Sequence, residues 1–197
     1  MKRLLPLIAT LFAIACCAAQ NLRKVPLADP FILLYDGVYY AYGTGAGSGI
    51  EVWTSRDLST WERAKGNARD GLALHRTDVW GEKWFWAPEV YRLNDKFYMY
   101  FTAEEHICVA TSDSPLGPWT KYDRNPLLQN PGELVGVGHS ALFRDKAGNL
   151  KIVFHAHKSK GAIHPREMYI TDVRFRPVEG GCRMEIDPGY SPALIAE

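Results

Sequence analysis

The sequence lacks the features that mark nucleic-acid-binding, zinc-binding and membrane-spanning proteins. Its 23 basic and 22 acidic residues leave a formal charge of +1, and this near-balance argues against a nucleic-acid or anionic-membrane partner. It has four cysteines but no CxxC pair and no histidine and cysteine cluster that would suggest zinc. It shows no sustained helical period and no apolar run long enough to span a bilayer comfortably.

The N-terminus has the layout of a secretory leader. Two cations are followed by an apolar run over residues 4–15 and then by small residues. Cleavage after Ala19 predicts a signal peptide at 1–19 and a single mature domain at 20–197. The alternative is a lipoprotein cut before Cys16, which would be anchored by a lipid. Both readings predict export, to the periplasm, the medium or the cell surface.

Two cysteines, Cys108 and Cys182, lie beyond the predicted leader. A disulfide between them is compatible with an exported protein. The other reading is that they are two separate small core residues, since one pair at no recognisable spacing specifies little.

An internal repeat indicates the fold class. DGVYYAY at 36–42 and DKFYMYF at 95–101 are similar, and a fainter third copy, DKAGNLKIVFHAH, occupies 145–157. Each copy opens with a turn signal and continues with an alternating, aromatic and β-branched strand, which is the pattern of a β-hairpin. The repeat therefore predicts an all-β chain of about three four-stranded units of roughly 50 to 60 residues, the size of propeller blades. Closed propellers typically need about four to eight such blades.

Several longer motifs then resemble a known family. They are LADPFILLYDGVYYAYGTG at 27–45, WFWAPEVYRLNDKFYMYF at 84–101, ATSDSPLGPW at 110–119, GVGHSALF at 136–143 and HPREMYITDVRF at 164–175. Together they resemble the five-bladed β-propeller glycoside hydrolases of family 43, which include arabinofuranosidases, xylosidases and arabinanases. The resemblance implies inverting hydrolysis of arabinose- or xylose-containing polysaccharide by a general-base Asp, a general-acid Glu and a second Asp that tunes the acid.

Asp29 matches the general base of that family. Inversion needs one carboxylate to activate water and a second carboxylic acid to protonate the leaving oxygen, roughly 6.5 to 9.5 Å apart. Pro30 is tolerated at a strand start, so Asp29 can face the propeller axis from the end of the first strand. An ordinary Asp-Pro turn is the competing interpretation.

The partner carboxylates have no match in this sequence. By the resemblance they belong to the third and fourth blades, and neither segment is present. The nearest imitations, Glu179 before two glycines and Asp187 before a proline, are left unassigned. Two central blades are therefore predicted to be missing, with a seam inside 110–126, and we interpret this as an internal deletion.

Aromatic side chains supply a candidate sugar platform. Trp84 and Trp86 can stack on the C–H face of a sugar ring. The family motif favours Trp86 for the pocket and Pro88 for its wall, whereas tryptophan packing between blades is the alternative for both rings. Glu89 follows the motif but is interpreted as structural.

Three further positions complete the predicted site. His139 matches a histidine at the propeller axis, which the resemblance links to a hydrated calcium, although a hydrogen-bonded core histidine fits the sequence nearly as well. Arg166 matches a late arginine that binds sugar hydroxyls, a task suited to its fork of donors, with a solvated arginine as the alternative. His155 and His157 share one strand face and are predicted to be packing or rim residues.

The sequence thus predicts an exported glycoside hydrolase that requires no cofactor, with calcium as an open alternative, and whose activity is impaired by the missing acid. Two alternatives stay open. One is a non-catalytic carbohydrate-binding remnant that keeps the aromatic platform. The other is an unclosed propeller whose exposed strand edges promote aggregation.

Overall fold

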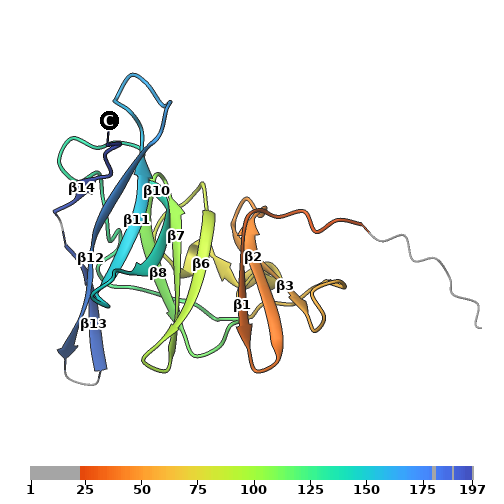
Figure 1. Ribbon diagram of the computed structural model, residues 1–197. Helices are drawn as coiled ribbons and strands as arrows, with labels where there is room; N and C mark the ends of the chain where they lie inside the picture. The colour runs from red at the N-terminus through yellow and green to blue at the C-terminus, as the bar shows by residue number, and fades with distance from the viewer. Residues whose placement is uncertain (1–22, 179–180, 188, 197) are drawn as a thin grey trace, which may run out of the picture.

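The computed structural model describes residues 23–178, 181–187 and 189–196, which form three antiparallel sheets (Figure 1). Blade 1 contains β1 (Ala28–Tyr35), β2 (Val38–Thr44), β3 (Gly49–Ser55), β4 (Glu62–Arg63) and β5 (Leu74–His75). Blade 2 contains β6 (Trp86–Leu93), β7 (Lys96–Ala103), β8 (His106–Ser112) and β9 (Thr120–Lys121). Blade 3 contains β10 (Gly138–Arg144), β11 (Leu150–Ala156), β12 (Glu167–Val178), β13 (Gly181–Ile186) and β14 (Ser191–Pro192). The predicted all-β class and the three repeat units are confirmed.

Two short 3₁₀ helices, Arg69–Gly71 and Arg76–Asp78, complete the described secondary structure. The predicted signal peptide, the lipid-anchor alternative at Cys16 and the unassigned Glu179 lie outside the described residues. Among the residues that are described, no helix is both long and apolar enough to cross a membrane. Cys108 is a buried free thiol.

The residues predicted to form turns do join antiparallel strands into β-hairpins. Asp36 and Gly37 join β1 to β2 with φ values of 48° and 71°, and Asn94 and Asp95 join β6 to β7 with φ values of 49° and 61°. A positive φ at both central residues matches the right-handed twist of the flanking strands, and Asn, Asp and Gly adopt it most readily. The third hairpin uses a longer loop, in which the Asp145 carboxylate accepts hydrogen bonds from backbone N–H groups of Ala147 and Asn149.

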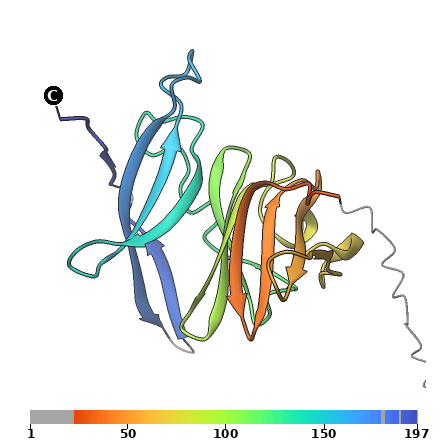
Figure 2. The ribbon, with the colours of Figure 1, turned by 45° about the vertical axis from the view of Figure 1, so that its right-hand side comes forward.

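The three blades fan out from their first strands. Within each sheet the strands follow chain order, so β1, β6 and β10 form one edge of their sheets. β6 lies against both β1 and β10, which makes these three strands the innermost ones (Figure 2). This arrangement is that of neighbouring blades in a β-propeller, here represented by three blades.

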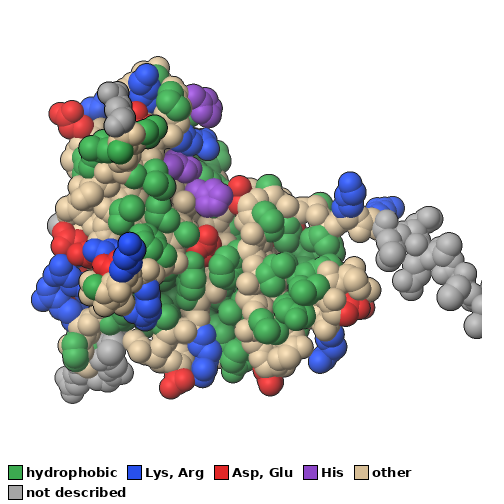
Figure 3. Space-filling model, in the orientation of Figure 1, with side chains coloured by type: hydrophobic (Ala, Val, Ile, Leu, Met, Phe, Trp, Pro, Cys, Tyr) green, Lys and Arg blue, Asp and Glu red, His purple; other side chains and the backbone are tan. Residues whose placement is uncertain are grey.

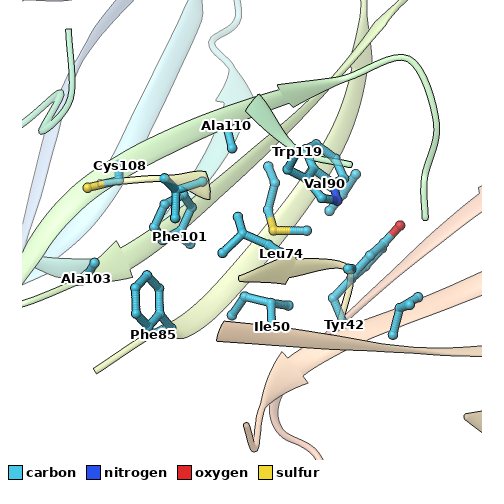
Figure 4. Packing of buried hydrophobic residues seen from close by; sticks show 14 of the residues in the cluster. Tyr42, Ile50, Leu74, Phe85, Val90, Phe101, Ala103, Cys108, Ala110 and Trp119 are labelled. Atoms are coloured by element: carbon cyan, nitrogen blue, oxygen red, sulfur yellow. The ribbon is translucent and has the colours of Figure 1, made fainter. Parts of the chain in front are cut away.

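Two apolar clusters hold the blades together. One lies between blades 1 and 2 and includes Tyr42, Ile50, Leu74 and Phe101, all fully buried (Figure 4). The other lies between blades 2 and 3. Alternation along β7 serves both clusters, because Phe97, Met99 and Phe101 face blade 1 whereas Tyr98 and Tyr100 face blade 3. This is why FYMYF is apolar at every position although its side chains alternate.

Candidate active site

The predicted site residues Asp29 and His139 occupy equivalent backbone positions in different blades. Each innermost strand has a register shift near its start, between 28 and 31, 86 and 89, and 138 and 141. The residues at these bulges are Asp29, Ala87 and His139, with φ values of 45°, 48° and 45°. Non-glycine residues with positive φ cost about 1–3 kcal/mol and cluster at functional sites, and bulges re-aim side chains there. We call these three positions the bulge residues.

Hydrogen bonds link each bulge residue to the preceding blade. The backbone N–H of Ala87 donates to Oγ1 of Thr44, at 2.9 Å, and the backbone N–H of His139 donates to Oγ1 of Thr102, at 3.0 Å. Thr44 and Thr102 stand at the same register position of their blades, paired with Ala28 and Trp86. One threonine hydroxyl per blade boundary therefore fixes the bulge of the next blade.

A pocket of about 580 Å³ opens at this end of the fan. It brings together the predicted residues Asp29, Trp86, His139 and Arg166, and Trp84 also lines it. Its other lining residues are Thr44, Gly45, Ala46, Gly47, Lys83 and Phe85. Pro88 is not among them: it is buried in β6 two residues after Trp86, so the structure does not place it on the predicted pocket wall.

Asp29 is held by contacts on both carboxylate oxygens. The hydroxyl of Thr44 donates to Oδ2 at 2.7 Å, and Nδ1 of His139 lies 3.9 Å from Oδ1. The Thr44 oxygen already accepts the N–H of Ala87, so its single proton is directed at Asp29. The Asp29 side chain is 33% exposed. The carboxylate is thus oriented by the fold and remains accessible to a ligand.

The two tryptophans present different surfaces. Trp86 is half-buried and stacks on His155, with ring centroids 5.8 Å apart and planes inclined by 22°. Trp84 is 57% exposed, and Nζ of Lys83 lies 4.3 Å from the centroid of its ring. The alternative of Trp84 as packing between blades does not fit this exposure. Both rings are available to a flat apolar ligand face, which a sugar ring provides.

His155 lies behind the pocket. Burial, followed by the nearby positive groups Arg166, His139 and His157, lowers the pKa of His155 to about 4, so its imidazole is neutral at neutral pH. Its Nε2 is shielded from water and has no hydrogen-bond partner among the described residues. His157, on the same strand face, lies 3.6 Å from the carboxylate of Glu105.

Glu89 lies at the boundary of blades 2 and 3 and does not line the pocket. Burial raises its pKa above the ordinary value, although hydrogen bonding from the Tyr91 hydroxyl and the charge of His139 act in the opposite direction. The Tyr91 oxygen in turn accepts the backbone N–H of Leu142. The predicted structural role of Glu89 agrees with this position between two blades.

Asp29 is the one carboxylate among the described residues that line the pocket. The unassigned Asp187 instead lies on blade 3, where its carboxylate is 3.6 Å from the guanidinium of Arg174. No group of three or more His, Cys, Asp or Glu within the described ranges could hold a metal ion. Calcium prefers six to eight oxygen ligands, so Asp29 and His139 alone fit it poorly, and no chemical step is assigned to it.

Three parts of the pocket were not predicted from the sequence: Thr44, Lys83 and the loop at 45–47. The available signal was the run GTGAG at 43–47, which starts at the end of β2, because a glycine-rich loop leaves room for a ligand. Nor was the environment of His155 predicted, for which the sequence offered no signal beyond the alternation of His155 and His157.

Comparison with known proteins identifies the family. The model of glycosyl hydrolases family 43 matches residues 23–126, which is more than half of the chain. The chain belongs to glycosyl hydrolase family 43. The match covers blades 1 and 2 and ends between β9 and β10, at the end of the predicted seam.

Relatives of this family 43 chain include enzymes that act on arabinan. An extracellular endo-α-(1→5)-L-arabinanase of Thermotoga petrophila is 27% identical over 167 residues, which cover 67% of this chain and 34% of the relative. A probable arabinan endo-1,5-α-L-arabinosidase B of Aspergillus fumigatus is 33% identical over 108 residues, which cover 52% of this chain and 28% of the relative. The chain therefore spans about a third of the length of the curated relatives it matches.

A solved structure supports the same assignment. The crystal structure of a thermostable family-43 glycoside hydrolase is 31% identical and superposes with a TM-score of 0.63, covering 75% of this chain and 48% of that protein. The family 43 chain thus shares its blades with a longer relative.

Thr44 offers a first test of the site's construction. Replacing Thr44 by valine, which keeps the side-chain shape, is expected to lower the free energy of unfolding by about 1–3 kcal/mol, because the Ala87 N–H loses its acceptor. Thr44→Ser is the matched control and is expected to retain most of the stability. Chemical denaturation measures both, and a valine variant as stable as the parent would contradict the shared hydroxyl.

Proposed function

We propose that this chain is an inverting glycoside hydrolase that acts on arabinose- or xylose-containing polysaccharide, with Asp29 as the general base. The observation that carries the proposal is the position of Asp29 in a pocket with Trp86, His139 and Arg166. The names of the arabinan-degrading relatives support the substrate class. Such a substrate lies outside cells, in keeping with the predicted export.

The proposed chemistry follows from the arrangement of the pocket. A sugar ring lies against Trp86 or Trp84, and the Arg166 guanidinium donates to its hydroxyls. Asp29, oriented by Thr44, accepts a proton from a water molecule. The water oxygen then bonds to the anomeric carbon while the glycosidic oxygen leaves from the opposite face, which inverts the configuration.

Asp29 is the one carboxylate among the described residues that line the pocket. The rate of hydrolysis is therefore expected to depend strongly on the leaving group of the substrate. A general acid contributes about 10²–10⁴-fold to the rate when the leaving oxygen must be protonated, and nitrophenolate departs without that help. A single copy of the chain is therefore expected to release nitrophenol from aryl arabinofuranoside or aryl xyloside, and to cleave alkyl glycosides and oligosaccharides far more slowly.

The test measures both kinds of substrate with purified protein. Nitrophenol release above the buffer rate, with inverted sugar product detected by NMR, is the expected result. If no nitrophenol were released from either aryl glycoside, the catalytic proposal would be contradicted. A retained configuration in the product would contradict the inverting mechanism.

A non-catalytic sugar-binding role is the second candidate, favoured by the exposure of Trp84 at the pocket mouth. Calorimetry with arabino- and xylo-oligosaccharides separates it from hydrolysis. Binding without any release of nitrophenol would support this second role.

A further inference from the structure

The charged groups that line the pocket do not balance. Among its described lining residues, Lys83 and Arg166 are cationic, and Asp29 is the single carboxylate that opposes them. Asp29 already faces two other groups, since Oδ2 accepts the Thr44 hydroxyl and Oδ1 lies 3.9 Å from Nδ1 of His139. The pocket therefore carries an excess of positive charge, which favours a ligand with an anionic group.

The two pocket cations have no acidic partner within the part of the chain that the structure describes. Neither Lys83 nor Arg166 forms an ion pair there, and both side chains are exposed. Other exposed cations of the chain do pair with carboxylates, as Arg92 does with Asp95 at 2.8 Å. The charges of Lys83 and Arg166 are thus available to an anionic group of a ligand.

The acids beside Lys83 are directed to other partners. The backbone N–H of Glu104 donates to the carbonyl oxygen of Lys83 at 3.3 Å, so these residues are neighbours. Oε1 of Glu104 accepts the backbone N–H of Glu82 at 3.0 Å. Oε1 of Glu105 lies 3.6 Å from Nε2 of His157. None of these three glutamates lines the pocket, so they do not occupy the place of an anionic ligand.

Trp84 holds the Lys83 ammonium group at the pocket mouth. Nζ lies 4.3 Å from the centroid of the Trp84 ring, a distance at which the face of an aromatic ring attracts a cation. Both residues are exposed and belong to the segment that leads into β6. A sugar ring that contacts Trp84 therefore presents its substituents close to the ammonium group.

Arg166 approaches the pocket from blade 3. It belongs to the segment that leads into β12, and after burial its charge is the strongest influence that lowers the pKa of His155. His155 stacks on Trp86, so the guanidinium charge acts on the inner wall of the pocket. Figure 3 shows basic, histidine and acidic side chains close together where the surface is hollowed between blades 1 and 3.

We propose that this pocket selects saccharides that carry a uronic acid beside the sugar to be cleaved, with Lys83 and Arg166 as the cations that attract its carboxylate. A uronic acid has a carboxylate in place of the terminal CH₂OH group, so its ring can still lie against a tryptophan face. The guanidinium fork matches a carboxylate with parallel hydrogen bonds, and the ammonium group supplies a point charge. The inference rests on the proposed function for the sugar chemistry and adds the charge of the substrate.

Calorimetry with matched pairs of ligands tests the preference. In the first pair, one ligand is an arabino-oligosaccharide that carries a single galacturonate, and the other is the same compound with its carboxyl group reduced, which converts galacturonate to galactose. The second pair is a xylo-oligosaccharide that carries glucuronate and its reduced form, so the two pairs distinguish the source of the uronic acid. Tighter binding of the acidic member of either pair would support the inference.

The salt dependence shows whether charge causes the preference. At about 0.01 M salt, the acidic ligand is expected to bind about 3–10-fold more tightly than its reduced form. At about 1 M salt, where screening confines charge interactions to about 3 Å, the two affinities are expected to become equal. A preference that persisted unchanged at the higher salt concentration would overturn the electrostatic selection.

Lysine variants test which cation is responsible. Lys83→Gln is expected to reduce the ratio of the two affinities to about half or less, whereas Lys83→Arg, which keeps the charge, is expected to retain it. Lys121→Gln is the matched control, because Lys121 is an exposed lysine on β9, the outermost strand of blade 2, and does not line the pocket. An unchanged ratio in Lys83→Gln, or an equal fall in Lys121→Gln, would overturn the inference.

The outcomes separate this inference from the proposed function. Equal or weaker binding of the acidic ligand in both pairs would overturn the selection of uronic acids and leave the proposed hydrolase intact. If none of the four ligands bound to the protein, the proposed function would itself be contradicted, and the inference with it.

Discussion

Asp29→Asn is expected to slow nitrophenol release by about 10²–10⁴-fold, because the asparagine amide cannot accept the proton of the attacking water. The substitution preserves an oxygen that can accept the Thr44 hydroxyl, so the local structure should persist. Oligosaccharide binding is expected to remain, since the tryptophans and Arg166 are unchanged. Steady-state kinetics and calorimetry measure the two effects separately.

Asp113→Asn is the control for a carboxylate outside the pocket. The Asp113 side chain is 86% exposed, and its ion pair with Lys96 is at the surface, so the rate should be unchanged. Equal rates in the Asp29→Asn and parent proteins would remove Asp29 from the mechanism.

Leu74→Ala is expected to lower the free energy of unfolding by about 2–5 kcal/mol, because it leaves a cavity where Leu74 fills the space between blades 1 and 2. Leu74 is fully buried in β5, whereas Leu58 is 50% exposed. The same change at Leu58 is expected to alter stability by less than about 0.5 kcal/mol.

Urea unfolding of the two leucine variants measures this difference directly. Since the chemical change is identical, the difference reports on burial alone. Similar stabilities for both variants would mean that blades 1 and 2 do not pack as a common core.

The hairpins could be predicted from the sequence because their causes are local. Asp36 and Gly37, and Asn94 and Asp95, tolerate the positive φ that a two-residue turn requires, and the alternating strands beside them leave little choice of register. Repetition of this unit then gave the number of sheets. The motif around Asp29, Trp86, His139 and Arg166 indicated residues that the structure gathers in one pocket.

Other features of the site depend on neighbours far apart in the chain. The sequence around Thr44 does not show that its hydroxyl oxygen accepts a hydrogen bond from the backbone N–H of Ala87, 43 positions later. The lowered pKa of His155 arises from burial and from charges on other elements. Pro88 was predicted on the pocket wall from its motif, but strand β6 carries it into the interior.

The sequence by itself determined the strands, their turns and the division into three repeating units, because these follow from backbone preferences and from side-chain alternation over a few residues. Only the tertiary structure decided which side chains meet at the bulges and which blade faces remain outward. Those outcomes depend on how whole sheets pack against one another, a relation between distant segments that no local pattern encodes.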